Sequence, residues 1–162
     1  MLFIQFPISA PNPHQKLKKF KKFKLCLFFD DVVTDDQSIS VMRSEVEKII
    51  NSFSIIKNYE NFILCHCFAG YSRSPAMAFI LKAIDKGPGQ EYNSLRFLST
   101  SYSDISPNKL MIHYAHEILG GALDLVGAYE LWEHEKKFGF SQTERKDIEA
   151  KMIKENPNIP IL

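Results

Sequence analysis

The residues best suited to chemistry lie in one segment, Leu64 to Pro75, which reads LCHCFAGYSRSP. Cys67 and Arg73 stand six positions apart in it, and mostly small residues separate them. An apolar run leads into this loop and a helical pattern begins near Arg73, which predicts a strand, a loop and a helix. Backbone N–H groups of such a loop and the positive end of the helix suit a phosphate dianion. A thiol and a guanidinium would face that anion, which predicts covalent phosphate transfer.

Phosphate transfer accounts for each residue type in the loop. The pKa of a free cysteine, about 8.5, falls to about 3.5–7.5 near positive charge and a helix N-terminus. We therefore expect Cys67 to attack phosphorus as a thiolate and to form a phosphocysteine. The planar fork of Arg73 binds two phosphate oxygens at once, which Lys would not do. Gly70 lets the backbone turn its N–H inward, and the hydroxyl of Ser74 can donate to the departing sulfur.

The segment resembles the signature of the cysteine-dependent protein tyrosine phosphatases, and more closely that of their dual-specificity branch and of small bacterial-type phosphatases. The signature is His-Cys, five residues, Arg, then Ser or Thr; the chain has His66-Cys67 and Arg73-Ser74, with Gly at the third position after the cysteine. Pro107-Asn108 is similar to a Pro-Asn pair that follows the loop in that branch. The resemblance covers roughly residues 25 to 130.

This resemblance implies the fold and the domain organisation. We expect an α/β fold with a central, mostly parallel sheet flanked by helices, as in protein tyrosine phosphatases. The N-terminal part of the sheet would be shortened, because only 24 residues precede Leu25. Residues 1–162 would form a single phosphatase-like domain. Its parts would be an irregular basic arm at 1–24, a catalytic core at 25–139, and a charged helix and tail at 140–162.

The resemblance also implies an enzyme, a metal-independent protein tyrosine or dual-specificity phosphatase. Its substrate would be a phosphorylated protein or a small phosphomonoester, and it would use no cofactor and no metal. Cys67, Arg73 and Ser74 would be catalytic, with His66 supporting the thiolate from behind and Asn108 holding the loop. The residues that would surround the phosphate are Phe68, Ala69, Gly70, Tyr71, Ser72 and Arg73. Because the loop holds no lysine, inositol lipids are less favoured than protein substrates.

A phosphatase also needs an acid that protonates the leaving oxygen, a contribution of about 10²–10⁴ in rate. In the family this acid is an Asp that follows a strand upstream of the cysteine. The candidates are Asp30, Asp31, Asp35 and Asp36. Asp31 follows an apolar run with one residue between them and matches the related Phe-x-Asp pattern, so we favour it over Asp30. Asp35 and Asp36 also suit the start of the next helix, where acidic residues cap and stabilise.

Hydrophobic spacing predicts the elements that position these residues. Compact apolar runs at Leu25–Phe29 and Phe62–His66 predict strands. Ser141-Gln142-Thr143-Glu144 is a capping box ahead of a charged helix. The remaining helices are expected around 42–53, from Arg73 to about Gly87, around 92–98, from Pro107 to Leu119, and from Val126 to Gly139.

The composition of the chain bears on its binding partners and on its cellular location. A net charge of +1 gives no general argument for binding nucleic acid or a membrane, and no segment reaches the length of a membrane span. Three cysteines make a poor disulfide framework, so we expect a reducing, cytoplasmic location. Lys16 to Lys24 holds six lysines in nine residues. It is either a solvated basic segment or a docking strip for acidic partners.

Two other functions compete with phosphate hydrolysis. A phosphate-binding pseudo-phosphatase would use the same loop to hold a phosphorylated partner and would dock through Lys16 to Lys24. A rhodanese-like sulfurtransferase also has a cysteine at the head of an anion-binding loop. The sequence Ser72-Arg73-Ser74 and the segment at Pro107-Asn108 fit a sulfurtransferase less well than a phosphatase. A zinc site at Cys65 and Cys67 lacks further ligands at suitable spacing.

Overall fold

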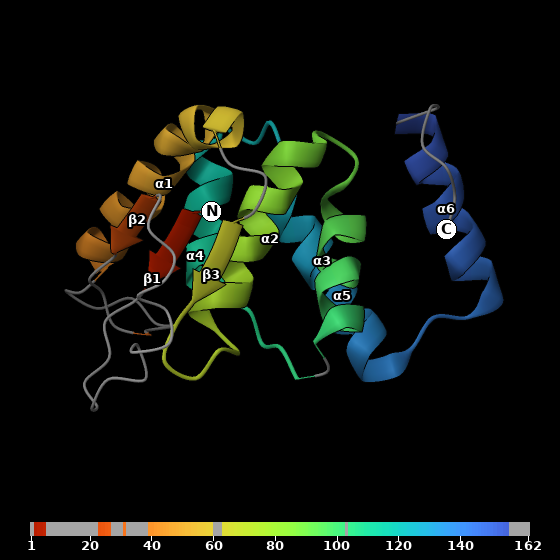
Figure 1. Ribbon diagram of the computed structural model, residues 1–162. Helices are drawn as coiled ribbons and strands as arrows, with labels where there is room; N and C mark the ends of the chain where they lie inside the picture. The colour runs from red at the N-terminus through yellow and green to blue at the C-terminus, as the bar shows by residue number, and fades with distance from the viewer. Residues whose placement is uncertain are drawn as a thin grey trace.

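The computed structural model describes residues 2–5, 23–26, 31, 39–59, 63–102 and 104–155. The described strands are β1 (Leu2–Gln5), β2 (Phe23–Cys26) and β3 (Ile63–His66). The described helices are α1 (Ile39–Tyr59), α2 (Arg73–Lys86), α3 (Glu91–Ser101), α4 (Lys109–Ile118), α5 (Leu125–Phe138) and α6 (Gln142–Glu155). In Figure 1 the strands lie toward one side of the molecule and α6 stands at the opposite end.

The chain is mostly helical, with helices making up 69% of its described part. The predicted fold class, an α/β domain with a central, mostly parallel sheet flanked by helices, is therefore wrong. The strands have four residues each and pair in parallel in the order β2-β1-β3. The physical reason lies in the core: every hydrophobic residue known to be buried comes from a helix or a loop, and the side chains of β3 are only half-buried. Helices bury their apolar faces mainly against one another.

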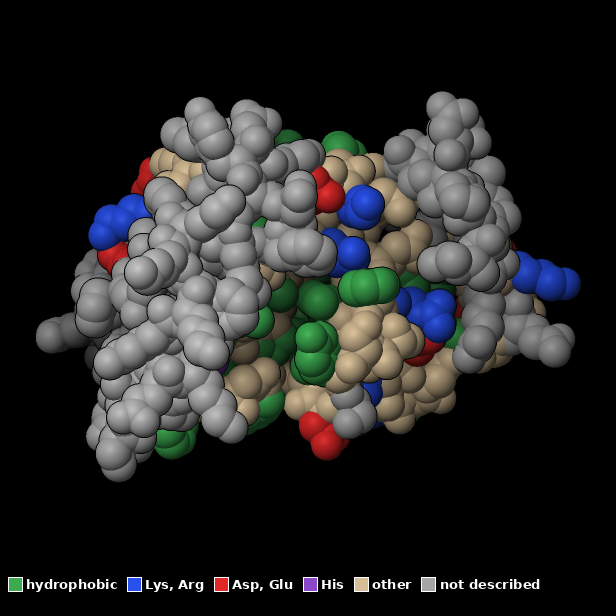
Figure 2. Space-filling view, viewed as in Figure 1, with side chains coloured by type: hydrophobic (Ala, Val, Ile, Leu, Met, Phe, Trp, Pro, Cys, Tyr) green, Lys and Arg blue, Asp and Glu red, His purple; other side chains and the backbone are tan. Residues whose placement is uncertain are grey.

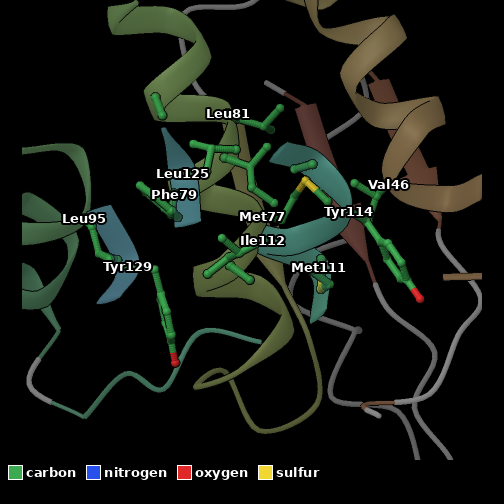
Figure 3. Packing of buried hydrophobic residues seen from close by; sticks show 14 of the residues in the cluster. Val46, Met77, Phe79, Leu81, Leu95, Met111, Ile112, Tyr114, Leu125 and Tyr129 are labelled. Atoms are coloured by element: carbon green, nitrogen blue, oxygen red, sulfur yellow. The ribbon is translucent and has the colours of Figure 1, made fainter. Parts of the chain in front are cut away.

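Helix α2 lies in the middle of this helical packing and contacts β3, α3 and α4. Figure 3 shows Met77 and Phe79 of α2 among apolar side chains from the neighbouring helices, including Leu95, Ile112 and Leu125. Both α2 side chains are fully buried. Full burial of such a side chain stabilises a protein by about 1.5–3 kcal/mol. The N-terminus of α2 is therefore held by a well-packed helix, which matters because the candidate site lies there.

Within the part of the chain that the structure describes, each helix predicted from hydrophobic spacing or from the capping box is found, in the predicted order. Strand β3 lies where the run Phe62–His66 predicts it. The predicted irregular arm at 1–24 needs a correction, because Leu2–Gln5 form β1 between the two other strands. The strand predicted at Leu25–Phe29 overlaps β2, which spans Phe23–Cys26, and residues 27–29 lie outside the described residues. Most of the basic segment Lys16 to Lys24 lies outside the described residues.

Polar contacts fix two of the peripheral helices. Arg43 of α1 forms an ion pair with Glu117 in the last turn of α4, and its guanidinium carbon lies 5.5 Å from the centre of the Tyr114 ring of the same helix. The capping box ahead of α6 is confirmed: the Glu144 backbone N–H donates to Ser141 Oγ at 3.2 Å, and the Ser141 N–H donates to Glu144 Oε2 at 2.9 Å. Both contacts are local features of the kind that sequence patterns predict.

The described surface carries charges of both signs. Figure 2 shows hydrophobic side chains near the middle of one face, with basic and acidic side chains close to them. The Lys82 ammonium, for example, lies 3.9 Å from the centre of the exposed Phe97 ring, within the range of a cation–π contact. Partial burial, together with the charge of Lys86, lowers the pKa of Lys82. None of the described helices combines the length and the apolar character needed to cross a membrane.

Candidate active site

The candidate site is the loop between β3 and α2. It begins with Cys67, directly after β3, and ends at Ser72, the N-cap of α2. Gly70 has a φ of +79°, a left-handed conformation that glycine adopts without strain. No atom lies within 4 Å of where a Cβ of Gly70 would stand, so the backbone conformation alone requires glycine there. The predicted strand, loop and helix are thus confirmed around the residues proposed for chemistry.

The sulfur of Cys67 is buried at the head of this loop, with the residue only 3% exposed. The Gly70 backbone N–H donates to Cys67 Sγ across 3.2 Å. The hydroxyl of Ser74, in the first turn of α2, lies 3.1 Å from the same sulfur. A backbone amide and a hydroxyl therefore both approach Sγ at a helix N-terminus, an environment typical of reactive cysteines.

Cys65 lies only two residues away but has a different environment. It is a half-buried residue of β3 that packs against the hydrophobic core. Burial, reinforced by the nearby charge of Cys67, raises the pKa of the Cys65 thiol to about 12. Cys65 therefore stays protonated at neutral pH and is a structural thiol. Both cysteines carry free thiols.

Arg73 is the first residue of α2 and is buried, with 8% of the residue exposed. Its Nε lies 3.7 Å from Oδ2 of Asp31, which makes an ion pair. A buried guanidinium that is held from its Nε side keeps the fixed fork geometry that recognises phosphate oxygens. The structure thus places Cys67 and Arg73 at the two ends of one short loop, as the sequence predicts.

Asp31 reaches this loop from a distant part of the sequence. Its Oδ1 accepts hydrogen bonds from Ser72 Oγ and from Asn108 Nδ2, each at 2.8 Å. The carboxylate is partly accessible, with 30% of the side chain exposed. Of the four aspartates considered as the acid, Asp31 is therefore brought to the site. The other three, Asp30, Asp35 and Asp36, lie outside the described residues.

Asn108 connects the loop to α4. It is the N-cap of that helix, is 1% exposed, and its Oδ1 accepts from the Met111 backbone N–H at 3.0 Å. Its own backbone N–H donates to the Ser72 carbonyl at 3.1 Å. A second backbone bond runs beside it, from Ser106 N–H to the Tyr71 carbonyl at 2.7 Å. The segment before α4 therefore runs along the loop and fixes it from one side.

The remaining predicted loop residues divide into a rim and a support. Phe68 and Tyr71 are 61% and 51% exposed, and Ala69 is exposed beside them. They form an accessible, largely apolar rim. His66 is the half-buried last residue of β3, on the strand that delivers the loop.

The contact that sequence reasoning missed is the one made by the side chain of Ser72. A serine directly before a helix usually bonds an N–H of that helix, so no long-range partner is expected from the sequence. Here Ser72 makes no such side-chain cap, and its hydroxyl donates to Asp31 instead. The pairing depends on a contact between residues 41 positions apart, which local pattern does not encode.

Neither a search for metal-binding clusters nor comparison with known proteins assigns a function to this site. Among the described residues, no group of three or more His, Cys, Asp or Glu side chains is placed to hold a metal ion. Comparisons of the chain with protein-family models, with curated proteins and with solved structures found no match. The chemistry must therefore be argued from the residues of the site themselves.

Proposed function

We propose that this protein hydrolyses phosphomonoesters through a phosphocysteine intermediate on Cys67. The observation that carries the proposal is the convergence of four groups on one loop: Sγ of Cys67, the Ser74 hydroxyl, the Arg73 guanidinium and the Asp31 carboxylate. A nucleophile, a cation for phosphate oxygens and a proton donor are the parts that this reaction needs. The resemblance of the loop residues to the cysteine-dependent phosphatases supports the same chemistry.

The reaction would proceed in two steps. In the first, the Cys67 sulfur attacks phosphorus, the bond to the ester oxygen breaks, and that oxygen takes a proton from Asp31. In the second, water attacks the phosphocysteine, Asp31 accepts a proton from the water, and the S–P bond breaks. Arg73 and the loop amides would hold the phosphate oxygens throughout. The Ser74 hydroxyl, 3.1 Å from Sγ, would donate to the sulfur as it leaves.

The substrate class follows from the rim of the loop. Phe68 and Tyr71 are both exposed aromatic residues and offer an apolar surface beside the phosphate position. An aryl phosphate, such as a phosphotyrosine side chain, would pack against them. We therefore propose a protein tyrosine or dual-specificity phosphatase. A reducing compartment such as the cytoplasm would keep Cys65 and Cys67 as thiols.

The test is metal-free hydrolysis of 4-nitrophenyl phosphate by the wild-type protein in the presence of a chelator. Cys67→Ser should abolish turnover, and Cys65→Ser is the matched control because it makes the same change two residues away. Loss of activity in Cys67→Ser alone supports the proposal. Activity that needs a metal and survives Cys67→Ser would refute it. Phosphopeptide binding without turnover would instead favour a binding module, and thiosulfate-dependent activity would favour a sulfurtransferase.

A further inference from the structure

We infer that Ser72 and Asn108 are positioning residues that determine which oxygen of Asp31 carries the transferred proton. The inference rests on the proposed phosphatase function and concerns its acid step. The two side chains donate to the same atom, Oδ1, and neither donates to Oδ2. The proton of the acid form is therefore assigned to Oδ2.

A carboxyl oxygen accepts only a limited number of hydrogen bonds. Each oxygen offers two lone pairs to donors. On Oδ1 both are occupied, by Ser72 Oγ at 2.8 Å and by Asn108 Nδ2 at 2.8 Å. A proton on Oδ1 would have to displace one of these hydrogen bonds, and the displaced donor belongs to a buried residue. Buried donors without partners are costly, so the proton belongs on Oδ2.

Oδ2 is also the oxygen that faces the phosphate-binding group. It lies 3.7 Å from Nε of Arg73, at the start of α2. In the acid step the Oδ2–H bond breaks and a new O–H bond forms on the ester oxygen as its bond to phosphorus breaks. In the second step Oδ2 takes a proton from the attacking water. Both transfers use one oxygen, while Oδ1 stays bound to its two donors.

Both donors are residues at helix starts, which explains how they hold the carboxylate in place. Ser72 is the N-cap of α2 and Asn108 is the N-cap of α4. The two N-caps are joined directly, because Asn108 N–H donates to the Ser72 carbonyl at 3.1 Å. Groups fixed on packed helices orient a catalytic side chain more tightly than groups on loops. Asp31, whose side chain is partly exposed, is thereby oriented by two buried residues.

Two substitutions remove these donors without removing a helix cap. Ser72→Ala deletes only the hydroxyl, since Ser72 makes no side-chain cap on α2. Asn108→Asp keeps a side-chain oxygen that accepts from the Met111 N–H. It replaces the amide nitrogen that donates to Asp31 with an oxygen, so a second carboxylate stands beside that of Asp31. Asp124→Asn is the matched control for that exchange, because Asp124 is the N-cap of α5 and accepts only from the Gly127 N–H of its own helix. Ser72→Thr restores the hydroxyl and should restore the function.

The first readout is the pH dependence of kcat on phenyl phosphate, whose leaving group needs protonation. We expect kcat to fall about tenfold in each donor variant, with KM changed less than about twofold. The alkaline limb of the Asn108→Asp profile should move to higher pH, because two adjacent carboxylates favour protonation of one of them. The other ionisable groups of this loop are the thiol of Cys67 and the phenol of Tyr71, and those that flank it are His66 at the end of β3, the Arg73 guanidinium at the start of α2 and Lys109 at the start of α4. All of them are unchanged in these variants. The inference would be overturned if both Ser72→Ala and Asn108→Asp had the pH dependence of kcat that the wild type has. It would also be overturned if Asp124→Asn lost as much kcat as these two variants.

The second readout does not require turnover. The ¹³Cγ resonance of Asp31, assigned by comparison with Asp31→Asn, is followed against pH in the wild type, Asn108→Asp and Ser72→Ala. We expect the second carboxylate in Asn108→Asp to move this curve to higher pH relative to the wild type. If the wild type hydrolyses no ester, the proposed function fails, while this titration still shows whether Ser72 and Asn108 influence the protonation of Asp31. A titration curve that is the same in all three proteins would overturn the inference, and Ser72→Ala keeps the test valid if Asn108→Asp does not fold.

Discussion

The starts of α2 and α4 differ from the starts of α5 and α6 in where their polar side chains bond. At α5, Asp124 accepts from Gly127 N–H three residues on, and at α6 the capping box joins Ser141 to Glu144. At α2 and α4, Ser72 and Asn108 reach Asp31, which is 41 and 77 positions away. Capping bonds that stay within one helix stabilise that helix. Long-range bonds to one carboxylate instead build a site, and this difference locates the candidate active site.

The largest expected effect comes from changing Asp31, the proposed acid. Asp31→Asn keeps an oxygen that can accept from both donors but removes the transferable proton. We expect kcat for phenyl phosphate to fall by about 10²–10⁴, with a smaller loss for a dinitrophenyl ester, whose leaving group needs little protonation. Asp147→Asn, an exchange at an exposed position on α6, is the control and should leave both rates unchanged. Equal losses on the two esters would show that Asp31 acts in some way other than as an acid.

The next effect concerns Cys65, whose environment differs from that of Cys67. Its pKa is about 12 in the folded protein against an ordinary value of 9.0, because of burial and then the charge of Cys67. Between these two values the unfolded chain releases a proton that the folded chain keeps, so the free energy of unfolding falls as pH rises. We expect a loss of a few kcal/mol at most across this range. Cys65→Ala should flatten that part of the curve in urea unfolding; a curve as steep as that of the wild type would contradict the assignment.

The free energy of unfolding should also distinguish the start of α4, where the N-cap side chain bonds Asp31, from the start of α5, where it bonds only its own helix. Asn108→Ala removes a buried side chain that bonds both Met111 N–H and Asp31, so we expect the free energy of unfolding to fall by about 2–3 kcal/mol. Asp124→Ala removes one exposed cap and should cost about 1 kcal/mol. Urea titration of both variants measures the difference. Equal losses would mean that Asn108 acts only as a cap.

The smallest effect is expected at α6. The hydrogen bonds from Ser141, first from its side chain and then from its backbone, lower the pKa of Glu144 below its ordinary 4.5. The capping box therefore stabilises the helix at pH values above that ordinary value and is lost as pH falls below it. We expect a slight decrease in far-ultraviolet circular dichroism over this acid range, which Ser141→Ala should reduce. An identical acid transition in Ser141→Ala would place the effect elsewhere.

The sequence predicted the local parts of this molecule well. The helices follow from hydrophobic spacing, and the loop follows from residues that are contiguous in the chain, with Cys67 and Arg73 six apart. The expected fold class is wrong because it follows from a resemblance carried mainly by one loop, and contiguous loop residues do not encode how much of the core a sheet contributes. In the structure the described core is built by helices. Burial by helix packing and burial by a sheet give similar short apolar patterns, so periodicity alone does not distinguish them.

The partners within the site were the other part that local pattern did not encode. The position of Asp31 after an apolar run predicts it as the acid, yet the sequence places its donors Ser72 and Asn108 only in the loop and in its support. Their convergence depends on how the starts of α2 and α4 meet in three dimensions. Side chains at N-cap positions have local partners by default, so a long-range partner is seen only once the helices are placed.

The measurement that tests the central claim most directly is detection of the covalent intermediate. The wild-type protein is mixed with 4-nitrophenyl phosphate, quenched in acid within the first turnover, digested and examined by mass spectrometry. We predict phosphate on the sulfur of Cys67, none on Cys65, and none anywhere in Cys67→Ser. Turnover without any phosphate on Cys67, or phosphate on another residue, would contradict the account.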